Sequence, residues 1–155
     1  MKSKNMIKFG AGQKLWKEAK KIIPGGNMFL SKKSETYLPN FWPSYFKSAK
    51  GCIVKDLDGR SYFDMTMSVG TNILGYSNKS INDAVIKVIQ KSTMSTLNPA
   101  EEVQLARKLL KLHSWAGGAK FARTGGEANA LSLRIARSYC KKTKIAFCGY
   151  HGWHD

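Results

Sequence analysis

A glycine turn in the C-terminal part of the sequence has the composition of an anion-binding site. Thr124, Gly125 and Gly126 lie between a short apolar segment and a segment of helical periodicity that begins at Glu127. The first N–H groups of a helix have no partner inside the helix, and the helix dipole is positive at that end. Glycines let the backbone approach an anion, and the threonine hydroxyl adds a donor. The turn therefore predicts a phosphate or carboxylate cradle, although many such turns are only tight connections.

Aromatic and imidazole side chains follow the next apolar segment, residues 145–148. Tyr150 and His151 should emerge at the same sheet edge as the glycine turn, because ligands of open α/β sheets bind outside the carboxyl ends of the strands. A ring delivered there could stack on a planar cofactor, or it could simply be packed. Three residues near the end of the sequence are of types that bind metals, namely His151, His154 and Asp155. Their spacing matches no defined metal motif, so we predict no metal site there.

The elements around these two motifs predict a parallel strand pair. Residues 119–123 and 145–148 have the composition of short buried strands, and residues 127–139 have a strong helical pattern between them. Strand, helix and strand in that order imply a crossover connection in an α/β fold.

The preceding sequence predicts three further helices and one hairpin. Apolar residues recur at helical spacing over 13–23, 81–89 and 99–112. Asn82 or Ser80 could cap the second of these helices. Asp58 and Gly59 lie between two alternating segments, which is a strong signal for a β-hairpin.

The bulk composition indicates a globular protein and argues against several other classes. The net charge of +16 comes mostly from scattered lysines rather than from the arginine forks typical of nucleic-acid readers, so a basic nucleic-acid-binding module is the disfavoured alternative. No apolar run is long enough to span a bilayer and no signal peptide is evident, which favours a cytoplasmic protein. The three cysteines indicate neither a disulfide framework nor a zinc site, and we expect buried or half-buried thiols: Cys52, Cys140 and Cys148.

Several motifs in order resemble class III aminotransferases, which use pyridoxal 5′-phosphate (PLP). Residues 124–130, Thr-Gly-Gly-Glu-Ala-Asn-Ala, resemble the family's Ser-Gly-Thr-Glu-Ala-Asn, and residues 150–152 match its Tyr-His-Gly. The hairpin over 54–64 resembles the family's Asp-x-Asp-Gly-x-x-Tyr-x-Asp signature. Residues 22–26, Ile-Ile-Pro-Gly-Gly, resemble the start of the glutamate-1-semialdehyde 2,1-aminomutase branch. The resemblance covers about residues 13–155.

This resemblance implies the fold type I architecture of PLP enzymes, an α/β fold with a mostly parallel sheet. Residues 1–65 would contribute to the small domain, and residues 66–155 would begin the large PLP-binding domain. Thr124, Gly125 and Gly126 would hold the PLP phosphate, and Tyr150 would stack on the ring with His151 beside it. The chemistry would be amino-group transfer from a small-molecule donor to an aldehyde or keto acceptor, in a homodimer.

The resemblance also implies that no catalytic residue lies within these 155 residues. The family's Schiff-base lysine lies beyond the Tyr-His-Gly motif, so we expect an N-terminal fragment that is inactive alone. A non-catalytic remnant that pairs with an intact homologue is the other alternative. Gly126 replaces a threonine of the family, Tyr76 replaces a histidine, and Val69 stands where the aminomutase branch has a tryptophan near the substrate. These departures argue against glutamate 1-semialdehyde as the substrate.

Overall fold

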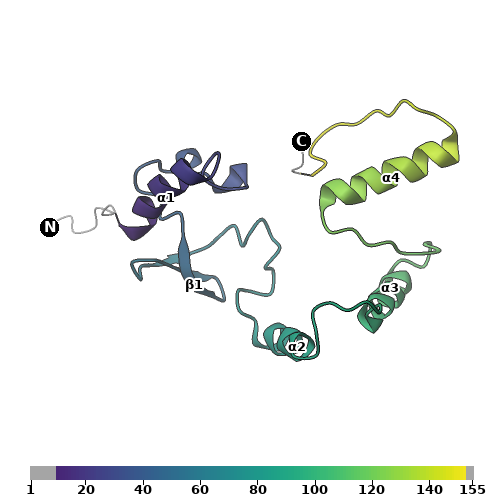
Figure 1. Ribbon diagram of the computed structural model, residues 1–155, viewed down its shortest axis with the longest axis horizontal. Helices are drawn as coiled ribbons and strands as arrows, with labels where there is room; N and C mark the ends of the chain where they lie inside the picture. Colours follow the sequence, from purple (N-terminus) through teal and green to yellow (C-terminus); the bar gives the residue numbers. More distant parts are fainter. Residues whose placement is uncertain (1–9, 153–155) are drawn as a thin grey trace. The chain divides into compact units, whose positions relative to one another are not determined.

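The computed structural model describes residues 10–152, which form two compact units, one up to Thr93 and one from Met94. Each unit is described by itself (Figure 1). The expected domain boundary after residue 65 stays a prediction.

The first unit begins with helix α1 (Ala11–Ile22), which agrees with the helix expected over 13–23. Its inward face carries Trp16 and Ala19, which are 4% and 5% exposed and are the buried hydrophobic residues of the described chain. Gly26 follows in a left-handed conformation (φ +81°), where a Cβ atom would lie 2.6 Å from the Trp16 ring. A glycine is therefore needed here both for its backbone angle and for its lack of a side chain.

Two 3-10 turns, η1 (Leu30–Lys32) and η2 (Ser34–Thr36), lead from α1 towards the sheet. Glu35 of η2 accepts hydrogen bonds from the Trp16 indole at 3.1 Å and from the Lys20 ammonium at 2.7 Å. These bonds, the one from Lys20 first, lower the pKa of Glu35 from 4.5 to about 2. The carboxylate thus joins the irregular segment to the helix.

Three antiparallel strands form the sheet of this unit: β1 (Phe46–Lys50), β2 (Ile53–Asp56) and β3 (Ser61–Phe63), in the order β1-β2-β3. The β2–β3 pair confirms the hairpin that Asp58 and Gly59 predicted. Strand β1 was not expected, because its sequence, Phe-Lys-Ser-Ala-Lys, carries few of the branched and aromatic residues that mark strands.

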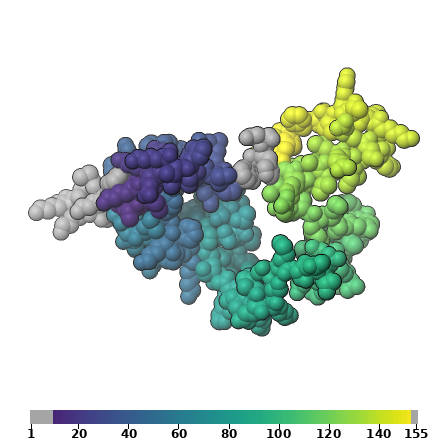
Figure 2. All heavy atoms as spheres, in the orientation of Figure 1, coloured from purple at the N-terminus to yellow at the C-terminus, as the bar shows by residue number. Residues whose placement is uncertain are grey.

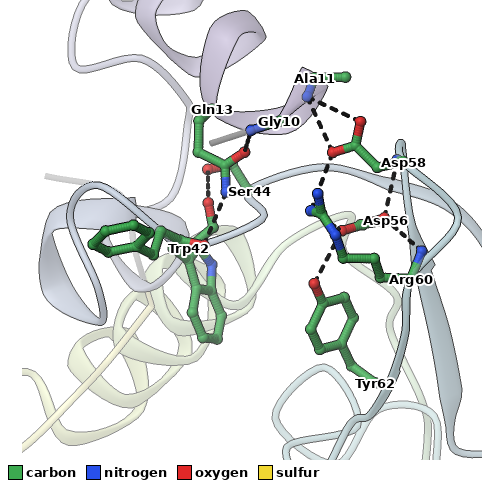
Figure 3. A network of polar contacts seen from close by, with 10 residues as sticks. Gly10, Ala11, Gln13, Trp42, Ser44, Asp56, Asp58, Arg60 and Tyr62 are labelled. Atoms are coloured by element: carbon green, nitrogen blue, oxygen red, sulfur yellow. Dashed lines mark hydrogen bonds and ion pairs between the residues drawn. The ribbon is translucent and has the colours of Figure 1, made fainter. Parts of the chain in front are cut away.

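Polar contacts fasten the hairpin to α1 (Figure 3). Asp56 is 3% exposed and accepts hydrogen bonds from the Asp58 and Arg60 amides, the Arg60 guanidinium and the Tyr62 hydroxyl. Burial by itself would raise the pKa of Asp56, but these bonds outweigh it and the pKa is lowered. Asp58 in turn accepts from the Ala11 amide at 3.1 and 3.2 Å. The acidic residues of the hairpin motif therefore hold the first unit together.

A turn with an unusual backbone follows β3. Met67, Ser68, Val69 and Gly70 all have φ between +45° and +80°, although only the last is a glycine. Asp64 holds this turn, because its carboxylate accepts from the Met67 amide at 3.0 Å and from the Tyr76 hydroxyl at 2.6 Å. The bond from Tyr76 lowers the pKa of Asp64.

Helix α2 (Lys79–Ile89) ends the first unit and matches the expected helix over 81–89. The predicted caps, Ser80 and Asn82, are wrong. Asn78 is the cap, and its side-chain oxygen accepts from the Ile81 amide at 3.3 Å. The helix therefore begins two residues before the apolar pattern that starts at Ile81.

The second unit contains α3 (Ala100–Leu112) and α4 (Gly125–Cys140), which match the expected helices over 99–112 and 127–139. The two strands predicted at 119–123 and 145–148 do not form: both segments are irregular in the structure. A strand needs a hydrogen-bonded neighbour, and no backbone group of the described residues pairs with either segment. The prediction of a parallel pair is therefore wrong for this chain.

Helices α2, α3 and α4 bury none of their residues, so their apolar faces have no cover within the described chain. All three cysteines are exposed, which contradicts the expected buried or half-buried thiols: Cys52, Cys140 and Cys148. Within residues 10–152, no helix has both the length and the apolar composition needed to cross a bilayer.

Candidate functional site

The first turn of α4 is built around Thr124. This residue has extended backbone angles (φ −140°, ψ 161°), and its hydroxyl oxygen accepts from the Glu127 amide at 3.2 Å. Threonine is a favoured residue at this capping position because its short side chain can reach back to the helix amides. The predicted turn thus leads directly into a helix that starts at Gly125.

The amides of Gly125 and Gly126 point out of this helix start. No acceptor among residues 10–152 receives a hydrogen bond from either of them. Gly125 is exposed and Gly126 half-buried, so the start of the helix is not covered by packed side chains. Two adjacent donors at the positive end of a helix dipole are suited to an anion.

The acidic residue of this turn does not occupy the cradle. Glu127 reaches back to Arg123, whose guanidinium lies 2.6 Å from one carboxylate oxygen and whose amide donates to the other at 2.9 Å. The hydrogen bond to Glu127 raises the pKa of Arg123. This pair was missed in the sequence, although an acid four residues after an arginine at a helix start is a visible signal.

The chain returns to the start of α4 after the helix ends. Lys141 takes a left-handed conformation (φ 52°) at the C-cap, and the chain then runs back along the helix to its first turn (Figure 1). In Figure 2 the yellow atoms near the end of the described chain lie against the green atoms of the helix start. A Cβ atom on Gly152 would lie 2.7 Å from the Gly126 nitrogen. The structure therefore brings the two predicted motifs together.

One side-chain hydrogen bond joins the two motifs. The Asn129 amide, on the second turn of α4, donates to the main-chain carbonyl of His151. Sequence reasoning assigned no role to Asn129 or to Gly152, because a contact between residues so far apart in sequence leaves no local pattern.

Tyr150 and His151 differ in their surroundings. Tyr150 is 80% exposed and has no ring contact with another described residue. The His151 ring packs edge-on against Phe147, with ring centroids 5.3 Å apart. Both side chains are thus accessible beside the helix start.

Two of the three metal-binding residue types noted near the end of the sequence, His154 and Asp155, lie outside the described residues. Among residues 10–152, no group of three or more acidic, histidine or cysteine side chains is arranged to hold a metal ion.

A second concave feature lies wholly within the first unit. It is a cavity of about 510 Å³ between the sheet, the left-handed turn and the aromatic segment before β1. Its polar lining includes Asp64, Ser68 and Tyr76, which are already hydrogen-bonded to one another.

The chain is similar to aminotransferases over almost all its length. The family described as "Aminotransferase class-III" matches residues 37–154. A 3-aminobutyryl-CoA aminotransferase of Cloacimonas acidaminovorans is 37% identical over 96% of this chain, and a glutamate-1-semialdehyde 2,1-aminomutase of Methanococcoides burtonii is 35% identical over 97%. The chain spans 36% and 35% of these two proteins, about a third of their length.

Solved structures give the same result. An omega-transaminase from Sphaerobacter thermophilus shares 28% identity with a TM-score of 0.81, over 93% of this chain and 32% of that one. A transaminase with PLP bound shares 27% identity with a TM-score of 0.81, over 92% of this chain and 33% of that one. The glycine turn, the returning Tyr-His-Gly segment and these similarities agree, and the chain belongs to the class III aminotransferase family.

Proposed function

We propose that this chain supplies the phosphate-binding turn and the ring-contacting segment of a PLP-dependent aminotransferase. The single observation that carries the proposal is the contact between Gly152 and Gly126, which brings the Tyr150 segment to the open start of α4. The start of α4 offers amide donors, and the exposed ring of Tyr150 belongs to the segment that contacts it. A phosphorylated, planar, aromatic ligand matches both features.

The residues present fit such a ligand. The amides of Gly125 and Gly126 can donate to phosphate oxygens, and Thr124 lies at the same turn. Gly126 carries no hydroxyl, so it acts through its backbone alone. Gly152 leaves empty the space in front of the Gly126 nitrogen, which any side chain would fill. The cradle is thus shaped by three residues without side chains, as close approach to phosphate requires.

The side chains beside the cradle bind and orient the ligand. Tyr150 is accessible for stacking on a pyridine ring, and His151 flanks it. When bound, PLP supplies an electron sink for amino-group transfer. Arg123 keeps the Glu127 carboxylate away from the cradle, so its negative charge does not oppose the phosphate. None of the described residues is assigned a covalent role.

The proposed substrates are a small-molecule amino donor and an aldehyde or keto acceptor. Relatives of this chain include both a 3-aminobutyryl-CoA aminotransferase and aminomutases, so the acceptor is proposed only by class. Val69 and Tyr76 favour an acceptor other than glutamate 1-semialdehyde. We propose a homodimeric, cytoplasmic parental enzyme and expect no turnover from these 155 residues alone.

Binding of pyridoxamine 5′-phosphate to the 155-residue chain tests this proposal. This amine form of the cofactor cannot condense with the many lysines of the chain, which would confuse a titration with PLP itself. We expect saturable binding, with an affinity about tenfold or more above that for pyridoxamine, because the phosphate is held by the helix start. Fluorescence of the pyridoxamine ring reports the binding.

Adenosine monophosphate is the matched control, because it is also planar and carries one phosphate. A chain of net charge +16 attracts any anion, and such attraction falls steeply with salt. Equal binding of both ligands, with the same salt dependence, would favour the basic nucleic-acid-binding alternative and overturn the proposal.

A further inference from the structure

We propose that Asn129 is a positioning residue, which holds the Tyr150–His151 segment at the start of α4 and so sets where the Tyr150 ring meets a bound pyridoxamine ring. This inference rests on the proposed function and names how its aromatic contact is oriented.

The hydrogen bond of Asn129 is the first reason. Its side-chain amide donates to the His151 carbonyl, across 22 residues of sequence. Among residues 10–152, this is the one hydrogen bond between the returning segment, residues 141–152, and the rest of the unit. The segment forms no strand, so no ladder of backbone bonds fixes it.

The contact at Gly152 is the second reason. Its main chain lies so close to the helix start that a Cβ atom would be 2.7 Å from the Gly126 nitrogen and 3.1 Å from its Cα. Adjacent residues, His151 and Gly152, are therefore both fixed to α4, one by a hydrogen bond and one by close packing. Two neighbouring points fix the direction of the chain as well as its position.

The exposure of Tyr150 is the third reason. The ring is 80% exposed and packs against no other described ring, so its surroundings do not orient it. Its location follows from the backbone of the next two residues. If the bond from Asn129 is removed, the close approach of Gly152 is the contact with α4 that remains among residues 141–152, and the ring can swing away from the cradle.

The cradle itself does not depend on Asn129. The amides of Gly125 and Gly126 belong to the first turn of α4, which Thr124 caps by accepting a hydrogen bond from the Glu127 amide. We therefore expect loss of the Asn129 side chain to lower the affinity for pyridoxamine 5′-phosphate, whose ring Tyr150 contacts. The affinity for inorganic phosphate should stay the same.

The test compares Asn129→Ala and Asn129→Asp with the unsubstituted 155-residue chain. The probes are pyridoxamine 5′-phosphate and inorganic phosphate. We expect the affinity for pyridoxamine 5′-phosphate to fall about five- to tenfold, the effect of one neutral hydrogen bond, with phosphate affinity unchanged within about twofold. Quenching of the pyridoxamine fluorescence at saturation should also decrease, because the Tyr150 ring is less well placed. The aspartate has the size of asparagine but turns an acceptor towards the His151 carbonyl, so its loss should be at least as large.

Ser132→Ala is the matched control. Ser132 lies on the same helix and its hydroxyl donates to the Asn129 carbonyl at 2.8 Å, but it has no bond to the returning segment. It should leave both affinities and the quenching unchanged. Circular dichroism at 222 nm verifies the helix content of each variant.

Each other outcome decides against the inference in a different way. Equal affinities for the Asn129→Ala and Ser132→Ala chains would overturn the inference and leave the proposed function intact. Loss of phosphate affinity together with pyridoxamine 5′-phosphate affinity would show that Asn129 only holds the unit together, which also overturns it. Absence of binding by the unsubstituted chain would overturn the proposed function, and the inference with it.

Discussion

The main chain of Gly152 approaches the first turn of α4 more closely than any side chain would allow. Two requirements meet at this residue, because its φ is +117° and its missing Cβ would lie 2.7 Å from the Gly126 nitrogen. A backbone atom cannot move aside as the end of a flexible side chain can. The family motif therefore has a steric reason for ending in glycine.

Gly152→Ala should weaken the binding of pyridoxamine 5′-phosphate by about tenfold or more. The added methyl group either occupies the space in front of the Gly126 amide or pushes the Tyr150 segment away. The control is Gly149→Ala, because Gly149 also has a positive φ (+85°), but its new methyl group would have no neighbouring atom within 4 Å.

That control separates backbone strain from steric exclusion. Gly149→Ala carries a conformational cost of about 1–2 kcal/mol in stability but should leave affinity within about twofold. Equilibrium titration measures both variants. If both lose affinity equally, the close approach at Gly152 is not what shapes the cradle.

At the scale of elements, α1 is held by acidic residues from two neighbouring segments. Asp58 of the hairpin accepts from its first amide, and Glu35 of η2 accepts from Trp16 and Lys20 further along. Few apolar residues are buried here, so these charge-assisted bonds have an unusually large share in the stability of the first unit.

The pKa of Glu35, about 2 against 4.5 in the unfolded chain, predicts a pH dependence for this unit. A carboxyl with a lowered pKa adds stability that is fully present above pH 4.5 and is lost as the pH falls towards 2. The side chain is 45% exposed, so solvent screening keeps the contribution to about 0.5–1 kcal/mol.

Glu35→Gln should therefore destabilise the chain at pH 7 and make little difference near pH 2, as measured by urea unfolding followed by circular dichroism. Glu18→Gln is the control, because Glu18 is an exposed acidic residue of the same helix whose charge acts on Tyr45 and not on Trp16 or Lys20. If Glu35→Gln lowers the free energy of unfolding by the same amount at both pH values, the shape of the side chain, and not its charge, determines its contribution to stability.

Sequence reasoning located the helices well and the strands poorly, and the reason is physical. Helices bond within themselves, so their apolar periodicity is a local signal, as over residues 99–112 and 127–139. Strands bond to distant segments: β1 forms because β2 lies beside it, whereas residues 119–123 have a strand-like composition and no neighbour within the described chain. The site shows the same division, because the glycine turn was visible locally and the Asn129–His151 contact was not.

At the scale of the whole molecule, polar bonds rather than a hydrophobic core hold most of the described chain. Apolar residues on α2, α3 and α4 are largely exposed, for example Ile89 at 56% and Leu112 at 70%. Such faces in a class III aminotransferase are the kind that other parts of the fold cover. Stability should accordingly be uneven along the chain.

Amide hydrogen exchange measures this unevenness directly. Residues of β2 are hydrogen-bonded on both sides and should exchange slowest. The amides of residues 119–122 and 143–149 donate to no backbone carbonyl of the described residues and should exchange at close to unprotected rates. Slow exchange at 119–122 in the chain alone would mean that this segment pairs as a strand after all. Addition of pyridoxamine 5′-phosphate should then slow exchange at Gly125 and Gly126 while β2 stays unchanged, because the phosphate supplies the acceptor that these two amides otherwise lack. Protection spread evenly over the basic surface would instead indicate non-specific attraction to the positive charge of the chain.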